Sequence, residues 1–403
     1  MQEFTDFDPK KFVKQQTKAI KKAVGDSRAL IAVSGGVDST TCAVLTHRAL
    51  NQNLICVTLD TAFMREGEPE KVAQILSRSP LNLPVNVVNV QERFLCEMHG
   101  LRDAEEKRKK FRETFYRVLS ETAEKEGCHF LVQGTILADI VETKGGVKTQ
   151  HNVLEQIGIS TKKLYGFQVI EPVVSLYKGE VRQVARYLGI PAELSERQPF
   201  PGPALSVRVV GEIKTDKLEA LKKATAITEE KFAKYNPSQY FAAIIDDLEI
   251  QADHFVIHIQ EEATRFLSVP KRNLSVKVFE AKATGVTEGE RRYGKIAAIT
   301  ARTPDGTVHQ VPIKDLETLQ TRIITEHPHF TRILYAIKER VKKQAYVISL
   351  RSIQTNNFLT AEVSEIPWTT LSETAELILA NCSNVSTVYY DITPKPPATI
   401  EME

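Results

Sequence analysis

The sequence predicts an α/β fold, in which a parallel twisted sheet is followed by a smaller α+β domain in two tandem copies. Short apolar runs of strand length alternate with stretches of helical period between residues 28 and 189. A glycine-containing turn separates the first apolar run from the first long helix. Two segments beyond residue 310 repeat the same residue types at a constant spacing of 55. These three observations carry the prediction.

Five apolar runs are expected to form the strands of the parallel sheet. They are residues 29–33, 54–59, 85–90, 130–132 and 167–170. Continuously apolar strands separated by helices are typical of a parallel sheet that is covered on both faces. Ligands of such sheets bind at the carboxyl ends of the strands, so these loops are the place to look for a site.

A charged helix is expected between Arg102 and Lys125. It contains the basic run Lys107 to Lys110. Acidic residues three or four positions away can pair with these cations, which predicts a solvated face in preference to a nucleic-acid surface. The acidic residues are Glu105, Glu106, Glu113 and Glu121.

Composition excludes disorder and gives no general argument for a polyanionic partner. The chain has 403 residues, 42% of them hydrophobic and 26% charged, which predicts a globular protein of two or more domains. The net charge of +2 predicts neither nucleic-acid nor membrane binding. The five cysteines are widely spaced, which favours a reducing cytoplasm over a disulfide framework or a paired-thiolate metal site. No signal peptide or membrane-spanning run is expected, so the protein is predicted to be soluble and cytoplasmic.

The turn after the first strand is the strongest candidate for an anion site. Backbone N–H groups at a helix N-terminus bind phosphate, and two glycines let the phosphate oxygens approach closely. An aspartate inside such a loop predicts Mg²⁺ bridging the phosphates. The alternative, a plain glycine turn with a serine N-cap, explains the complete string less well. The string is Ser34, Gly35, Gly36, Val37, Asp38, Ser39 and Thr40.

This string resembles the pyrophosphate-binding loop of the N-type ATP pyrophosphatases, and it lacks the Gly-Lys-Ser/Thr of the Walker type. The resemblance implies a Rossmann-like sheet of the adenine nucleotide alpha hydrolase type and cleavage of ATP to AMP and pyrophosphate. It also implies adenylation: a substrate carbonyl oxygen attacks the α-phosphorus, and a nitrogen or sulfur nucleophile then displaces AMP.

Later motifs resemble the GMP synthetases. Residues 197–209 are similar to the signature strand-turn of that family, and residues 391–403 to its C-terminal tail. The resemblance runs from about Leu30 to Glu403. Further counterparts occur in the same order at 63–65, 133–135, 139 and 148–153.

The resemblance assigns roles to individual residues. The loop would hold ATP phosphates and Mg²⁺, with Asp38 on the metal, and Lys148 would neutralise developing charge, which makes these two the candidate catalytic residues. Three more residues would lie at the ATP site: Gly134, Thr135 and Asp139. Six would bind xanthosine 5′-monophosphate (XMP), whose phosphate suits arginine or lysine: Arg65, Arg197, Lys395, Thr399, Ile400 and Glu401. The alternative for each charged residue is a surface ion pair.

Several positions depart from the family pattern. Gln198, Gln150 and Met402 replace two histidines and an aromatic residue, and the segment 144–146 looks shortened. They leave open a paralogue that adenylates another nucleotide or a tRNA base, or a catalytically weak regulatory paralogue. Widely spaced cysteines argue against sulfur transfer, and the complete loop argues against a regulatory role.

The predicted domains are residues 1–211 (ATP pyrophosphatase), 212–270 (helical and β connector), 271–340 (first C-terminal copy) and 341–403 (second copy, with the substrate-binding tail). Residues 316–337 align with 371–392, and strand 296–302 resembles strand 346–351. The pattern alone leaves coincidence open, whereas the family resemblance implies two tandem copies. We expect these copies to pair within one chain, which would remove the need for a dimer and make a monomer.

The family's glutaminase signature, Gly-x-Cys-x-Gly, does not occur in this sequence. Ammonia is therefore expected to be free or supplied by a separate glutamine amidotransferase subunit.

Overall fold

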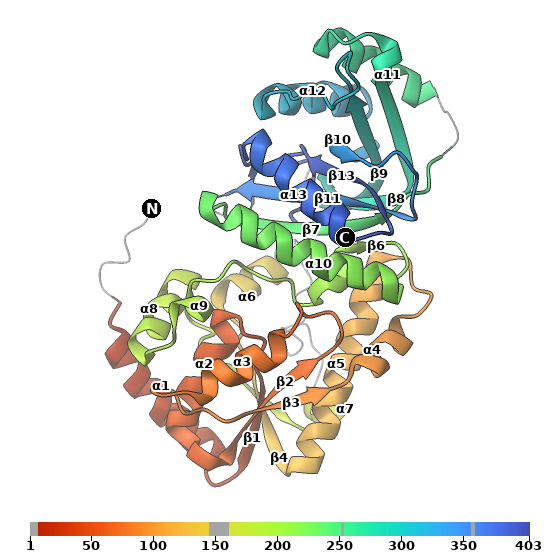
Figure 1. Cartoon of the computed structure of the whole chain (residues 1–403). Coiled ribbons are helices and arrows are strands. Elements are labelled where there is room, and N and C mark those ends of the chain that lie inside the picture. Colours follow the sequence, from red (N-terminus) through yellow and green to blue (C-terminus); the bar gives the residue numbers. More distant parts are fainter. Residues whose placement is uncertain (1–6, 145–160, 251–253, 288, 356–358) are drawn as a thin grey trace. The chain divides into compact units, whose positions relative to one another are not determined.

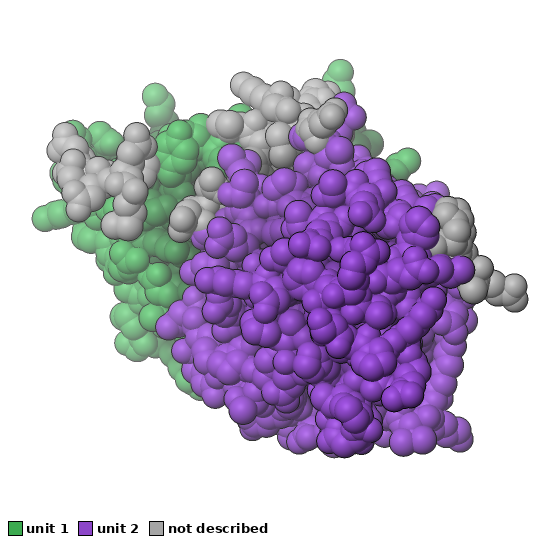
Figure 2. All heavy atoms as spheres, turned by 90° about the horizontal axis from the view of Figure 1, so that it is seen from above, with its two compact units in different colours: residues 1–97, 109–202 green, residues 98–108, 203–403 purple. Residues whose placement is uncertain are grey.

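A computed structural model describes residues 7–144, 161–250, 254–287, 289–355 and 359–403. The chain divides into two compact units, coloured separately in Figure 2. Unit 1 comprises residues 1–97 and 109–202, and unit 2 comprises residues 98–108 and 203–403.

Unit 1 contains the predicted parallel sheet. All its strands are parallel, in the order β3-β2-β1-β4-β5, and each predicted apolar run forms one of them, which confirms this part of the prediction (Figure 1). The edge strand β3 is more exposed than a covered sheet requires, with Val87 39% exposed. The strands are β1 (Arg28–Ala32), β2 (Leu54–Asp60), β3 (Val85–Asn89), β4 (Cys128–Val132) and β5 (Gln168–Ile170).

Helices of unit 1 form where an apolar face follows a start signal. α1 (Pro9–Val24) begins with proline after Asp8, whose carboxylate accepts a hydrogen bond from the Lys11 N–H at 3.1 Å. α8 (Lys178–Leu188) buries Val181, Val184, Ala185 and Leu188, the spacing of one helix face. Both helices contribute to one core with α2 (Val37–Leu50) and the sheet.

The other helices of unit 1 connect the remaining strands. The long helix α5 begins in unit 2 and continues in unit 1. These helices are α3 (Glu68–Ser77), α4 (Gln91–Met98), α5 (Ala104–Glu126), α6 (Leu137–Lys144), α7 (Thr161–Tyr165) and α9 (Ala192–Ser195), with a 3₁₀ turn η1 (Asn51–Asn53).

Unit 2 is built on one mixed sheet of eight strands. Seven follow the order β6-β7-β11-β13-β10-β9-β8, and β12 pairs with β11. The strands are β6 (Val209–Val210), β7 (Gln239–Asp246), β8 (Leu274–Thr287), β9 (Glu290–Ala301), β10 (Phe330–Glu339), β11 (Tyr346–Gln354), β12 (Glu362–Val363) and β13 (Val385–Asp391). Its helices are α10 (Thr215–Phe232), α11 (His254–Leu267), α12 (Ile313–Glu326) and α13 (Trp368–Asn381), with 3₁₀ turns η3 (Ala204–Val207), η4 (Ala233–Tyr235) and η5 (Lys271–Asn273).

Apart from β6 and β12, the strands of the unit 2 sheet fall into two halves with the same topology. We call α11, β8, β9, α12 and β10 the first half, and α10, β7, β11, α13 and β13 the second half. In each, a helix and an antiparallel strand pair lead through a 14-residue helix to a parallel strand. The halves meet where β10 pairs antiparallel with β13 (Figure 1). At this junction Tyr335 lies opposite Tyr390, the residue 55 positions later.

Two details of this arrangement differ from what the sequence suggests. The segment 212–270 provides α10, β7 and α11, so the second half includes elements that precede the first half in the chain. The similar strands 296–302 and 346–351 both end in an arginine, which suggests that Arg302 corresponds to Arg351. The strand registers instead make Thr300 the equivalent of Arg351, because Ile299 lies opposite Tyr335 and Leu350 lies opposite Tyr390.

The prediction that the basic run of α5 lies on a solvated face is wrong for Lys107. Arg108 does pair with Glu105, at 2.7 Å. Lys107 is instead fully buried: its ammonium donates to the carbonyl oxygens of Val209 (2.7 Å) and Gly211 (2.9 Å) and forms an ion pair with Glu403. Burial lowers the pKa of Lys107, whereas the Glu403 carboxylate opposes that shift.

Candidate active site

The predicted phosphate loop joins β1 to α2 in unit 1. Its N-cap residue is Gly36, and α2 has no side-chain cap, which contradicts the serine N-cap alternative. The hydroxyl of Ser39 accepts from the Ser34 N–H at 3.2 Å and lies 3.1 Å from the Ser34 hydroxyl oxygen. Helix N-terminal N–H groups that no side chain caps are suited to bind an anion.

Two glycines allow the loop its conformation. Gly35 has a φ of +78°, and a Cβ there would lie 2.6 Å from Cγ2 of Val72. Gly134, which follows β4, lies against the loop itself: a Cβ there would come within 2.8 Å of the Ser39 backbone nitrogen. The neighbouring strands β1 and β4 thus bring Gly134 into contact with the loop.

Asp38 makes an ion pair in the first turn of α2. Its Oδ2 accepts a hydrogen bond from the Lys178 ammonium at 2.5 Å. Burial raises the pKa of Asp38, the Lys178 charge lowers it in part, and the Asp139 carboxylate raises it again. Asp139 is held by the Ile136 N–H, which donates to its Oδ2 at 3.1 Å.

The side-chain oxygens of Asp38 and Thr40 are suitable ligands for a magnesium ion that also binds the phosphates of a nucleotide. Within the described part of the chain, the buried Asp38 Oδ1 and Thr40 Oγ1 have no hydrogen-bond partner. No cluster of three or more His, Cys, Asp or Glu side chains suited to a metal occurs among those same residues. Mg²⁺ is commonly held by one or two carboxylates together with substrate phosphates, and not by a cage of protein ligands alone.

Arg65 and Arg197 come together on one buried carboxylate. The Arg197 guanidinium forms two hydrogen bonds to Glu68, that between Nη2 and Oε2 measuring 2.6 Å, and Arg65 Nη1 lies 3.8 Å from Glu68 Oε2. Arg65 also stacks over the Phe200 ring, 4.1 Å from its centroid. Arg197 lies beside the loop, since a Cβ on Gly35 would be 3.4 Å from its Nη1. The two predicted substrate-binding arginines therefore adjoin the phosphate loop.

Sequence reasoning missed Lys178 and Glu68. Each begins a helix that follows a strand of the parallel sheet, the region where ligands of such folds bind. That position was the available signal, but a single charged residue in a first helical turn is too common to be singled out. Glu68 in particular is 4% exposed, although nothing in its sequence surroundings indicates burial.

We predict that Glu68→Gln weakens binding of the substrate more than that of ATP. The amide keeps the side-chain volume but loses the negative charge that orients both arginines. The Michaelis constant for the nucleotide substrate should rise about tenfold, with that for ATP changing less than about threefold. Steady-state kinetics with each substrate varied in turn measures both. Equal changes in the two constants would contradict this role for Glu68.

Four predicted substrate residues lie in unit 2, in the C-terminal segment. Lys395 exchanges backbone hydrogen bonds with Ala361, at 2.8 and 2.9 Å. Both carboxylate oxygens of Glu401 accept from Arg208, at 2.9 and 3.0 Å, so Glu401 forms an ion pair with a buried arginine that the sequence reasoning did not single out. Thr399 is held in an internal hydrogen-bond network, and Ile400 is half-buried beside it.

The structure describes Met402, one of the departures from the family pattern, but it describes neither Gln150 nor the predicted catalytic residue Lys148. Met402 is fully buried in the core of the unit 2 sheet, so this departure changes the packing of the tail. Lys148 and Gln150 lie outside the described residues. The role predicted for Lys148 stays a prediction.

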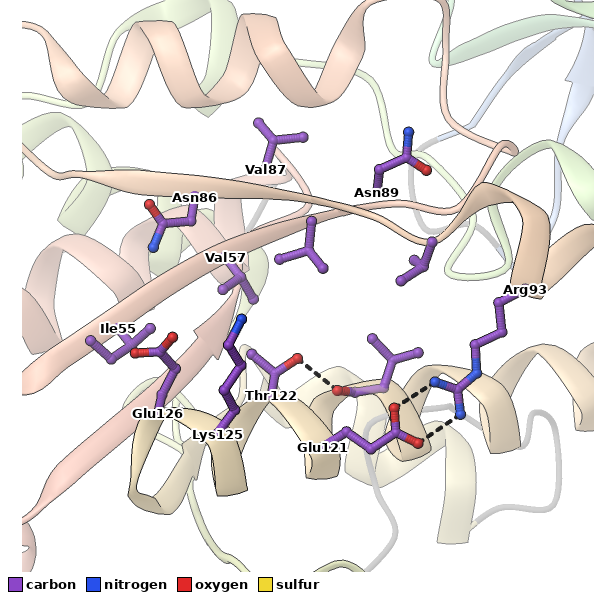
Figure 3. Close-up of a pocket in the computed structure, with 13 residues that line it drawn as sticks. Ile55, Val57, Asn86, Val87, Asn89, Arg93, Glu121, Thr122, Lys125 and Glu126 are labelled. Atoms are coloured by element: carbon purple, nitrogen blue, oxygen red, sulfur yellow. Dashed lines mark hydrogen bonds and ion pairs between the residues drawn. The ribbon is translucent and has the colours of Figure 1, made fainter.

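A groove of about 570 Å³ in unit 1 lies away from these residues. It is lined by β2, β3, α4 and α5, and Figure 3 shows Arg93 and Glu121 joined by an ion pair across part of it. None of the predicted site residues lines this groove.

The described residues bear on two features that the sequence does not predict, disulfide bonds and membrane-spanning helices. All five cysteines are free, and only Cys96 is exposed. None of the helices within the described ranges is long and apolar enough to cross a membrane.

Parts of both units match models of known protein families. Residues 9–191 match the family model of the PP-loop domain, and residues 337–402 match that of the GMP synthase C terminal domain. A subunit of the glutamine-hydrolyzing GMP synthase of Sulfurisphaera tokodaii is 43% identical over 399 residues, which cover 98% of this chain and 100% of that protein. The protein of the same description from Methanopyrus kandleri is 38% identical over 404 residues, with the same coverage. These matches confirm the resemblance to the GMP synthetases. The chain belongs to the family formed by this subunit of the glutamine-hydrolyzing GMP synthases.

Proposed function

We propose that this chain carries out the synthetase half of GMP formation. The C2 oxygen of XMP attacks the α-phosphorus of ATP and releases pyrophosphate. Ammonia then attacks C2, AMP leaves, and loss of a proton gives GMP. The observation that carries this proposal is the uncapped N-terminus of α2 beside Asp38, in a chain of this family.

The residues of the loop divide the work of binding ATP. Backbone N–H groups and the hydroxyls of Ser34 and Ser39 bind the phosphates, and Gly134 and Thr135 support the loop from β4. Lys178 holds Asp38 in orientation. Mg²⁺, when bound, supplies positive charge against the departing pyrophosphate, and Asp38 and Thr40 would hold it. Arg65, Arg197 and the tail residues Lys395, Thr399, Ile400 and Glu401 are the residues proposed to bind XMP.

We also propose that ammonia reaches this chain from a separate glutaminase subunit. The relatives are each described as one subunit of a glutamine-hydrolyzing enzyme, and the sequence of this chain has no Gly-x-Cys-x-Gly nucleophile context. Free ammonium should replace that subunit in the test tube.

Substrate identity is tested by thermal shift with purine nucleotides in the presence of a non-hydrolysable ATP analogue and Mg²⁺. A ligand that binds only the folded state raises the unfolding temperature in proportion to the logarithm of its concentration above Kd. XMP should raise it more than AMP, GMP or inosine monophosphate. If another nucleotide raised the unfolding temperature and XMP did not, that nucleotide would be the substrate and XMP would not.

We further propose that the two halves of unit 2 arose by duplication and pair within one chain. The domain boundaries proposed from the sequence are 1–211, 212–270, 271–340 and 341–403, and the elements α10, β7 and α11 of the two halves lie in the segment 212–270. Structural equivalence at a spacing of 55 supports a duplication. Tyr335 donates its hydroxyl to the His309 carbonyl at 2.8 Å, and Tyr390 donates to Ser364 at 2.6 Å, each donor and acceptor being 55 residues from its counterpart. Pro312 and Pro367 precede the two 14-residue helices in the same way.

This pairing predicts a monomer. β10 and β13 pair antiparallel within one chain, so the backbone N–H and C=O groups at this strand edge are already hydrogen-bonded. A second chain is therefore not needed to cover this edge. Light scattering of the purified chain should give a mass near 45.2 kDa. A mass near twice that value, with the contact mapped to these two halves, would contradict the proposal.

A further inference from the structure

Arg332 of the first half reaches the C-terminal tail (residues 392–403), which follows the second half. The Arg332 side chain is fully buried. Its Nη1 donates to Asp391 Oδ2 at 2.8 Å, and its Nη2 donates to the Thr399 hydroxyl at 3.0 Å and to the Glu401 carbonyl at 2.5 Å. One guanidinium from β10 therefore fixes two tail residues, on both sides of Ile400.

Asp391 already has a second arginine as its partner, so neutralising Asp391 does not explain why Arg332 is buried there. Arg351 also donates to Asp391 Oδ2, at 2.7 Å, and is equally buried. The trio thus contains two guanidinium groups and one carboxylate. Burial and the Arg351 charge lower the pKa of Arg332 to about 9, although the Asp391 and Glu401 carboxylates oppose this shift. Burying an unbalanced charge costs free energy, and Arg351 alone would balance Asp391. Arg351 also donates to the Thr393 and Thr399 carbonyls of the tail, both at 2.9 Å. What Arg332 adds is its hydrogen bonds to the Thr399 hydroxyl and the Glu401 carbonyl.

The two halves differ at this position in a complementary way. The counterpart of Arg332, 55 residues on, is Thr387, and the counterpart of Asp391 is Ala336. After β10 the chain continues into β11, whereas after β13 it forms the tail. The first half thus has an arginine at this position and is not followed by the tail, whereas the second half is followed by the tail and has a threonine at this position.

Other contacts also hold the tail on the first half. The Thr284 N–H of β8 donates to the Met402 carbonyl at 2.9 Å, and the Val286 N–H donates to the Pro397 carbonyl at 2.8 Å. Gly285 lies between them, and a Cβ there would be 2.7 Å from the Pro397 carbonyl oxygen. These contacts form a seat for the tail, and Arg332 adds a charged donor to that seat.

We propose that Arg332 is a positioning residue that the first half supplies to the tail of the second half, so that one nucleotide-substrate site is built from both halves. By fixing the Thr399 hydroxyl and the Glu401 carbonyl it sets where the Ile400 and Glu401 side chains point. This inference rests on the proposed function, in which the tail binds the purine nucleotide that is aminated.

The variant Arg332→Met tests the proposal, because it leaves Asp391 paired with Arg351 as a balanced pair. We expect a folded protein whose unfolding temperature stays close to that of the wild type. The Michaelis constant for XMP should rise about tenfold or more, whereas that for ATP should change less than about twofold. Thr387→Val, at the equivalent position of the second half, is the matched control and should leave both constants unchanged.

A second readout does not depend on turnover. Hydrogen–deuterium exchange of the Arg332→Met chain should increase at residues 399–402 and stay unchanged in the strands of unit 1. If the wild type forms no XMP-dependent AMP, the proposed function fails, and the exchange pattern still decides whether Arg332 positions the tail. If the methionine variant does not fold, Arg332→Lys, which keeps the charge with fewer donors, is measured in the same two ways. An unchanged Michaelis constant for XMP together with unchanged tail exchange would overturn the proposal.

Discussion

Replacing Gly134 by alanine should lower ATP-dependent AMP formation by about a hundredfold or more, with the fold retained. The new Cβ would lie 2.8 Å from the Ser39 nitrogen, 3.0 Å from the Asp38 carbonyl carbon and 3.2 Å from the Ser39 Cα. These are backbone atoms, so no side-chain rotation relieves the contact and the phosphate loop must shift. A displacement of about 1 Å in a substrate-positioning segment costs about a hundredfold in rate.

Gly179→Ala is the matched control for this substitution. Gly179 lies in the first turn of α8 and has no positive φ, and a Cβ added there would have no atom within 4 Å. Alanine there should leave the rate within about twofold and should stabilise the helix by up to about 1 kcal/mol. Circular dichroism checks the fold of both variants. A Gly134→Ala chain as active as the Gly179→Ala chain would show that the loop does not hold ATP as proposed.

Asp38→Asn should reduce the rate of AMP formation by about two to three orders of magnitude, the loss seen when one transition-state electrostatic group is removed. The amide has the same shape, so the loop keeps its geometry. It loses the ion pair with Lys178 and the charged oxygen proposed to hold Mg²⁺. Raising the magnesium concentration should not restore the rate.

The control for Asp38→Asn is Asp26→Asn, in the exposed turn between α1 and β1. It should leave the rate and the magnesium dependence unchanged. Wild-type activity in Asp38→Asn at ordinary magnesium concentrations would exclude Asp38 from metal binding and from the chemistry.

The loop and the strands of unit 1 could be predicted because local patterns specify them. Apolar runs of strand length, and glycines before a helix, are properties of neighbouring residues. The place of Gly134 at the ATP site was predicted from the family resemblance, and the structure explains its contact with the loop, because parallel strands place their carboxyl ends at one edge. The resemblance to a family supplied the substrate residues, which local patterns could not.

The buried charges could not be predicted, because their partners lie far away in the chain. Glu68 pairs with Arg197, 129 residues on, and Arg208 pairs with Glu401, 193 residues on. Lys107 stands in a run of four basic residues and looks solvated, yet it is buried against Glu403. Burial of one charge in such a run depends on tertiary contacts that leave no periodic signal.

The sequence indicates a similarity between the two halves only where a helix and a strand recur at a constant spacing. A spacing of 55 aligns α12 and β10 with α13 and β13. The leading helix and strand of the second half, α10 and β7, lie before the first half in the chain, so no constant spacing relates them to α11 and β8. Sheet order was needed to place them.

This chain should aminate XMP at the expense of ATP. The most direct measurement is to incubate the purified chain with ATP, Mg²⁺, ammonium chloride and XMP and to quantify all nucleotides by chromatography. GMP and AMP should appear in equal amounts, only when XMP is present, with no ADP. Failure to form AMP in response to XMP, or AMP formed without GMP, would contradict the account.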